Sequence, residues 1–113
     1  MCTQTTLNIV TDKIVQAARE SLGDKLDKVI LYGSYARGDY DSESDIDIMV
    51  LADIPRDDCW SEYLKISELT WKLDLEHDVL VSVNVTDCAT FYKYADILPF
   101  YMNVLKEGVD LVA

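Results

Sequence analysis

The feature that most constrains this chain is a pair of predicted strands joined by a glycine–serine turn and an acidic loop. The first strand, 26–32, holds an unbroken apolar run and ends at Gly33-Ser34. The second strand, 45–52, opens with Asp45 and Asp47. Alternate side chains of a strand share a face, so we expect both acids to point the same way, with Cα atoms about 6 to 7 Å apart. The sequence thus predicts two carboxylates at the entrance of a hydrophobic sheet.

The residues around these acids predict a site for a nucleoside triphosphate. Two converging carboxylates can hold a hard cation such as Mg²⁺ through oxygen atoms, although a bare Asp-x-Asp is more often a solvated strand start. Gly33 lets the chain turn sharply and brings the backbone close to a ligand. The Ser34 hydroxyl and the N–H groups of a short helical turn over 34–38 can cradle phosphate. A phosphate cradle that faces Asp45 and Asp47 indicates a triphosphate ligand.

Arg37 is the only cation in the loop between the two strands. It either neutralises neighbouring acids such as Asp39 and Asp41, or it contacts a phosphate or the acceptor of a reaction. Both roles remain open at this point, and Arg37 joins Gly33 and Ser34 as a candidate nucleotide-binding residue.

The two segments together resemble a known family. Gly-Ser-Tyr-Ala-Arg-Gly at 33–38, followed by Ser-Asp-Ile-Asp-Ile-Met-Val at 44–50, resembles the signature of the minimal nucleotidyltransferases of the polymerase-β-type superfamily. That group includes the MntA-like antitoxins that are paired with HEPN toxins. The motif spans 31–51, and the chain length also fits, so the resemblance is expected to extend over the whole chain.

The resemblance implies a reaction and a partner. Asp45 and Asp47 would hold Mg²⁺, and Gly33 and Ser34 would position the β and γ phosphates of ATP. The acceptor of AMP would be a hydroxyl of a HEPN-type toxin, which the modification silences, so the protein would be an antitoxin.

A third carboxylate, which the superfamily supplies from its third strand, is uncertain in this sequence. The predicted third strand, 79–85, alternates valines with more polar residues. Ser82 lies in the middle of its polar face, whereas the only acid on that face, Asp78, lies at its very start. Either Asp78 is the third carboxylate or Ser82 leaves that position without one.

The remaining chain alternates helices with strands, which predicts an α/β (α+β) fold of the nucleotidyltransferase type, a small mixed sheet covered by helices in one domain over 1–113. Trp60 and Trp71 are expected to be packing residues rather than a base-stacking platform. The other predicted elements are a helix over 6–22 capped by Thr5, Thr6 or Asn8, a helix to about 76 capped by Asp57, two short helices over 86–105 separated at Pro99, and an edge strand over 109–112.

Composition limits the partners. The net charge of −11 makes a nucleic-acid polymer an unlikely ligand and favours a basic protein. No apolar run approaches the ~18 residues that a membrane span needs, so we expect a cytoplasmic protein. Cys2, Cys59 and Cys88 show no metal-binding spacing and are expected to be free thiols. An oligomer is compatible with the sequence.

Three functions compete. A chain of 113 residues has little room for a second domain, so the acceptor site is expected to come largely from another molecule. The favoured function is AMP transfer to a toxin. A binding antitoxin without turnover is supported by Ser82 and opposed by the intact Gly33-Ser34 and acids. Transfer to a small cationic molecule such as an aminoglycoside would suit the negative charge.

Overall fold

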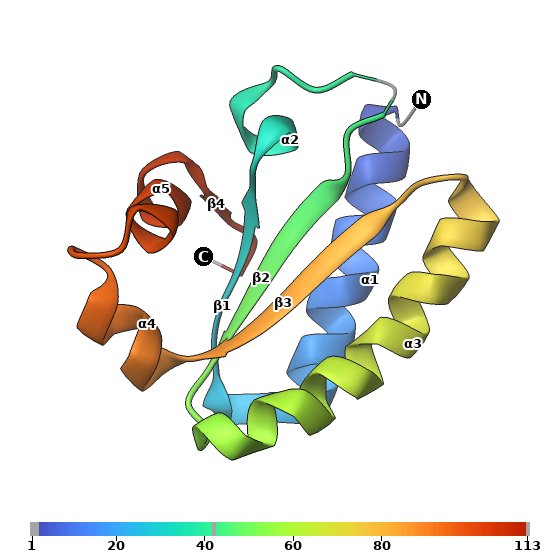
Figure 1. Ribbon diagram of the computed structural model, residues 1–113. Helices are drawn as coiled ribbons and strands as arrows, with labels where there is room; N and C mark the ends of the chain where they lie inside the picture. Colours follow the sequence, from blue (N-terminus) through green and yellow to red (C-terminus); the bar gives the residue numbers. More distant parts are fainter. Residues whose placement is uncertain (1–2, 42, 113) are drawn as a thin grey trace.

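The computed structural model describes residues 3–41 and 43–112, which leaves Cys2 outside the described residues. Its centre is a mixed sheet with the strand order β3-β2-β1-β4 (Figure 1). β2 runs antiparallel to β1 and parallel to β3, and β4 runs antiparallel to β1. The strands are β1 (Leu26–Tyr32), β2 (Ile46–Ala52), β3 (Val81–Asp87) and β4 (Val109–Asp110).

Five α-helices and two short 3₁₀ turns surround this sheet in the described part of the chain. They are α1 (Gln4–Leu22), η1 (Gly23–Lys25), α2 (Ser34–Arg37), η2 (Arg56–Asp58), α3 (Cys59–His77), α4 (Cys88–Tyr94) and α5 (Pro99–Glu107). None of the helices in the described ranges has the length and apolar content needed to cross a membrane.

The alternation of β2 divides the core between the two faces of the sheet. Ile46 and Ile48 belong to the cluster under α1 and α3, whereas Met49 belongs to a second cluster with Phe91 of α4 and Val104 of α5. Asp47 alternates with Ile46 and Ile48, so it continues the row of Met49 on the second face. The sheet therefore presents Asp47 on the side where α5 lies.

Helix starts differ from the sequence prediction by a few residues. α1 begins at Gln4 because the Oγ1 of Thr3 accepts a hydrogen bond from the N–H of Thr6 at 3.1 Å, which makes Thr3 the N-cap. α3 begins at Cys59, because the turn η2 intervenes and places Asp58, not Asp57, at the N-cap.

The expectation that Trp60 and Trp71 are packing residues is wrong, because 66% and 73% of their surfaces are exposed. Eleven residues are close to three helical turns, so both side chains lie on one side of α3. The opposite side buries Ile66 and Leu73 against the sheet. Spacing alone does not reveal which of these two apolar sides meets the sheet.

Candidate active site

Gly33 and Asp47 meet where β1 ends and β2 begins. Tyr32 pairs with Asp47 in the antiparallel register, so Gly33 follows directly at the edge of the acidic position. Gly33 has φ 76° and ψ −153°, a conformation that is essentially restricted to glycine. A Cβ at residue 33 would overlap Oδ2 of Asp47. The glycine of the motif is thus required twice, once for its backbone and once to admit the carboxylate.

The two acids lie close enough to interact. Asp45 precedes the first residue of β2 by one position, and the N–H of Ile46 bonds the carbonyl of Leu80 at 2.8 Å, which ties this end of β2 to the segment before β3. Burial raises the pKa of Asp47, the negative charge of Asp45 raises it further, and Arg37 lowers it. The ionised form of Asp47 is therefore disfavoured by its burial and by the charge of Asp45, and a further cation beside it would relieve this cost.

The chemistry of this pair fits a magnesium ion. Both donors are carboxylates, which are the hard oxygen ligands that Mg²⁺ prefers, and Gly33 leaves open the space that the Asp47 carboxylate enters. Within 3–41 and 43–112, no cluster of three or more His, Cys, Asp or Glu has a metal-binding arrangement. Mg²⁺ in proteins usually keeps several waters and is held by one or two carboxylates together with substrate phosphates.

The helical turn predicted after Gly33 forms as α2. Gly38 ends it in the left-handed conformation, with φ 85°, and its N–H donates to the carbonyl of Ser34 at 2.9 Å. Ser34 thereby begins the turn directly after Gly33.

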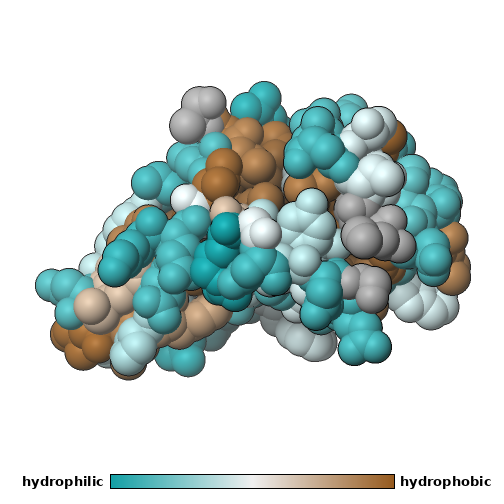
Figure 2. All heavy atoms as spheres, turned by 90° about the horizontal axis from the view of Figure 1, so that it is seen from above, coloured by the Kyte–Doolittle hydropathy of each residue, from teal (hydrophilic) through white to brown (hydrophobic). Residues whose placement is uncertain are grey.

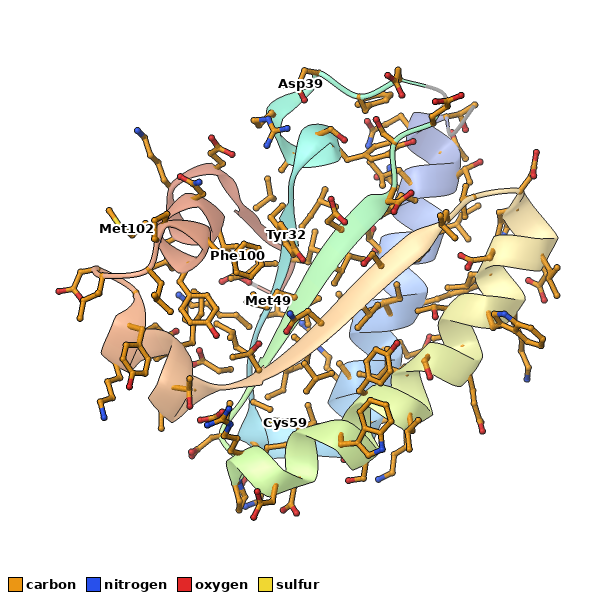
Figure 3. The ribbon with its side chains drawn as sticks, viewed as in Figure 1. Tyr32, Asp39, Met49, Cys59, Phe100 and Met102 are labelled. Carbon is orange, nitrogen blue, oxygen red and sulfur yellow. The ribbon has the colours of Figure 1, made fainter. Side chains whose placement is uncertain are left out.

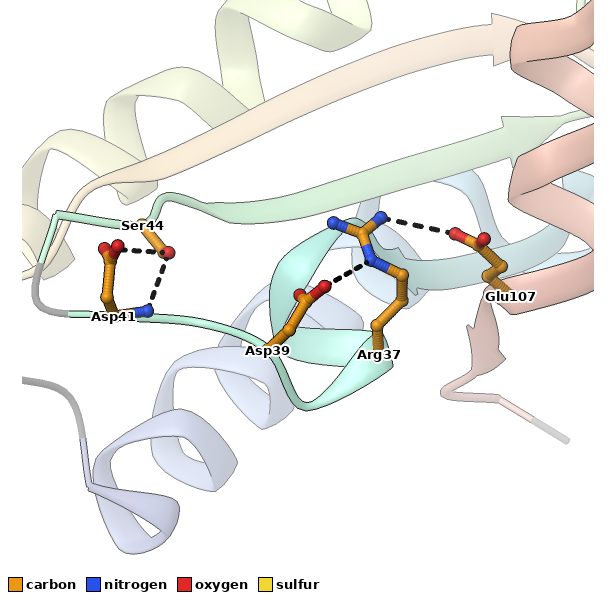
Figure 4. A network of polar contacts seen from close by, with 5 residues as sticks. All are labelled: Arg37, Asp39, Asp41, Ser44 and Glu107. Atoms are coloured by element: carbon orange, nitrogen blue, oxygen red, sulfur yellow. Dashed lines mark hydrogen bonds and ion pairs between the residues drawn. The ribbon is translucent and has the colours of Figure 1, made fainter.

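Arg37 pairs with two carboxylates (Figure 4). Its Nε lies 3.1 Å from Asp39 Oδ2 and its Nη1 lies 3.3 Å from Glu107 Oε2 at the end of α5. The first contact matches the neutralising role considered for Arg37. The second joins residues 70 positions apart and has no signal in the sequence. Both pairs are exposed to solvent, which screens them, so an anion can compete for Arg37.

The loop before Asp45 is also organised by a contact that sequence reasoning missed. The Oγ of Ser44 accepts a hydrogen bond from the N–H of Asp41 at 2.9 Å and donates to Oδ1 of Asp41 at 3.2 Å (Figure 4). This small ring lies directly ahead of Asp45 and limits the positions that the loop can take.

Ser82, rather than Asp78, lies beside Asp47. In the parallel register of β2 and β3, Asp47 pairs with Ser82, whose side chain is exposed. β3 begins at Val81, whose N–H donates to Oδ1 of Asp74 at 2.9 Å. Asp78 lies in the preceding turn as the left-handed C-cap of α3, with φ 52°. The position level with Asp47 on β3 therefore has a hydroxyl instead of a carboxylate.

A glycine–serine turn that packs against paired acids on a mixed sheet defines a nucleotide-transferring class of protein. The chain belongs to the nucleotidyltransferase domain family, whose model matches residues 12–111. The predicted family and enzyme class are thereby confirmed.

Relatives and solved structures agree with this assignment. "Putative protein adenylyltransferase MJ0604" of Methanocaldococcus jannaschii is 36% identical over 96 residues, which are 85% of this chain and 88% of that protein. A second protein of that organism, "Putative protein adenylyltransferase MJ0141", is 48% identical over 62 residues; the match covers 54% of this chain and 60% of that protein's length.

Among solved structures, a chain of a toxin–antitoxin complex with AMP-PNP has a TM-score of 0.53 and 27% identity over 88% of this chain and 70% of its own. A structure described as a "putative minimal nucleotidyltransferase" has a TM-score of 0.60 and 21% identity over 95% of this chain and 94% of its own, which shows a shared fold. The expected fold class is confirmed.

Proposed function

We propose that this protein transfers AMP from ATP to a hydroxyl of a HEPN-type toxin and so acts as its antitoxin in the cytoplasm. The observation that carries the proposal is the packing of the Asp47 carboxylate against Gly33, with Asp45 adjacent. Relatives named as protein adenylyltransferases and a toxin–antitoxin neighbour bound to AMP-PNP support both the reaction and the partner.

Each site residue has a role in this reaction. Asp45 and Asp47 would hold Mg²⁺, which when bound offsets negative charge on the triphosphate. Gly33 and Ser34 would hold the β and γ phosphates, and Arg37 would leave its surface carboxylates for a phosphate oxygen. The acceptor oxygen bonds to the α phosphorus, the bond to the β phosphate breaks, and pyrophosphate leaves.

Level with Asp47, β3 has the hydroxyl of Ser82 and no carboxylate to accept the proton of the acceptor hydroxyl. That proton would pass to solvent or to the leaving pyrophosphate. The chain's own contribution to the chemistry is therefore positioning and charge, and we expect slow transfer.

The test is mass spectrometry of a HEPN-type toxin after incubation with this protein, ATP and Mg²⁺. We expect the toxin to gain AMP units with the wild type and none with Asp45→Asn/Asp47→Asn. Asp12→Asn, the same chemical change on the exposed surface of α1, serves as the matched control and should behave as the wild type.

The position of Ser82 favours one second candidate, a binding antitoxin without turnover. A stable complex that suppresses toxicity, with no mass gain on the toxin and no effect of the double variant, would replace the transferase proposal with this one. A mass gain on an added aminoglycoside, with none on the toxin, would instead identify a small-molecule acceptor.

A further inference from the structure

A hollow of about 300 Å³ adjoins the predicted phosphate site on the α5 side. One wall consists of Tyr32, Gly33 and Arg37, and the opposite wall consists of Phe100, Asn103 and Glu107 of α5. Its volume is at the lower end of the usual range for small-molecule sites. Because Gly33 belongs to both the hollow and the acidic site, a ligand with its phosphates at Gly33 can extend into this space.

The far wall offers an aromatic face. Phe100 is 46% exposed, although it belongs to a helix that packs on the sheet. Its ring meets the ring of Tyr32 edge-on, with centroids 5.7 Å apart and planes at 76°. Figure 3 shows Phe100 turned toward Tyr32, while Met102 lies on the outer side of α5. The ring is thus fixed in orientation while part of it remains accessible from the hollow.

Polar groups flank this ring. Asn103 lies three residues after Phe100, on the neighbouring side of α5, and is exposed to the hollow. A carboxamide offers both a donor and an acceptor, which matches the N6 and N7 edge of adenine. Glu107 adds an acceptor suited to an exocyclic amino group, and its partner Arg37 lies on the phosphate side.

Figure 2 views the molecule from the end that carries α2 and shows mostly hydrophilic atoms there, with one patch of apolar atoms in the upper middle of the view and a smaller one at its lower left edge.

We propose that this hollow binds the ribose and base of the donor nucleotide, with Phe100 stacking on the base and Asn103 selecting a purine with an amino group at C6. This inference rests on the proposed function, because it requires the triphosphate to lie at Gly33 and the acids. It assigns nucleotide selectivity to α5, which lies outside the signature motif.

The experiment is calorimetric titration with ATP, GTP and inorganic tripolyphosphate, each with Mg²⁺. Loss of one base-stacking contact is expected to weaken ATP binding by about 5- to 150-fold in Phe100→Ala. Tripolyphosphate, which has no base, should bind the wild type and Phe100→Ala equally. Asn103→Ala should reduce the preference for ATP over GTP.

Two further variants separate stacking from folding. Phe100→Leu keeps an apolar side chain on α5 but removes the aromatic face, so it should also weaken ATP and spare tripolyphosphate. Met102→Ala alters the same helix at a residue that is equally exposed, 46%, and outside the hollow, and it should bind as the wild type.

The outcomes distinguish the two proposals. If the wild type binds ATP and both Phe100 variants retain its affinity within twofold, the base site is refuted while the transferase proposal stands. Equal weakening of ATP and tripolyphosphate by Phe100→Leu also refutes it. If the wild type binds neither ligand, the proposed function fails and this inference fails with it.

Discussion

The carboxylate of Asp47 lies where a side chain at Gly33 would begin. The contact joins the first residue after β1 to the second residue of β2, and the antiparallel pairing of Tyr32 with Asp47 fixes it. The glycine of the motif therefore meets a packing requirement in addition to any chemical role. The glycine is needed so that an acid can approach the phosphate turn without displacing it.

Gly33→Ala should damage both the fold and the site. The backbone strain alone is expected to cost about 1–3 kcal/mol of the free energy of unfolding, and the overlap with Asp47 adds to it. Gly23→Ala is the matched control, because Gly23 has a similar backbone, φ 57° and ψ −127°, with no atom within 4 Å of an added Cβ. Urea unfolding should show the larger loss for Gly33→Ala. Equal losses would mean that the overlap with Asp47 is relieved without cost.

Asp47→Asn should stabilise the metal-free protein at neutral pH while it reduces AMP transfer by at least ~100-fold. Burial first, and the charge of Asp45 second, raise the pKa of Asp47 above its usual 3.8. The unfolded chain therefore loses this proton at lower pH than the folded chain, so stability falls as pH rises from the usual value to the raised one. Above that pH range, the loss of stability caused by the ionised Asp47 stays constant, and below it this loss is absent.

Urea unfolding in EDTA at pH 7 and pH 3 tests whether Asp47→Asn is more stable than the wild type, as expected. The free energy of unfolding should be higher for Asp47→Asn than for the wild type at pH 7 and equal to it at pH 3. The control Asp12→Asn should match the wild type at both pH values. Added Mg²⁺ should stabilise the wild type more than the variant, because only the wild type retains both ligands. A variant that is less stable than the wild type at pH 7 in EDTA would contradict the raised pKa.

The sequence predicted that the glycine turn and the acids meet, but not the contacts around them, for physical reasons. Gly33 directly follows β1, and Asp47, 14 positions later, lies in the adjacent strand β2, so local pattern and spacing are sufficient to place them together. The Arg37–Glu107 pair joins the motif to a helix 70 positions away, and no local pattern specifies where that helix packs. Trp60 was misplaced because α3 has apolar residues on two sides, and only the sheet decides which side is buried.

Cys88 should be an unreactive thiol. Burial, and then the nearby charges of Asp27 and Asp53, raise its pKa to about 11. At pH 8 its thiolate fraction would be about a hundredfold below that of an ordinary thiol, so alkylation should be slower by about that factor. Peptide mapping after timed iodoacetamide treatment measures this rate. Asp27→Asn should accelerate the alkylation of Cys88, and reaction of the wild type at the rate of a free thiol would contradict the assignment. Cys59 and Cys88 are both free, as predicted.

Ser82→Asp should restore a third carboxylate to the site. Ser82 is exposed and pairs with Asp47 across β2 and β3, so an acid there would lie beside the other two. A general base in reach of the acceptor hydroxyl typically contributes 10²–10⁴-fold, and an acid placed by substitution should accelerate AMP transfer by about tenfold or more. The same charge should lower the stability of the metal-free protein at neutral pH, since three carboxylates then repel one another.

Asn84→Asp is the matched control for that variant, because residue 84 lies on the same face of β3 but pairs with Met49 instead of an acid. The rate of pyrophosphate release in the presence of the toxin should rise for Ser82→Asp and stay unchanged for Asn84→Asp. A stability loss for Ser82→Asp without any gain in rate would mean that the reaction does not need a base at this position. Ser82 would then be sufficient at this position, and the transfer would depend on positioning and charge alone.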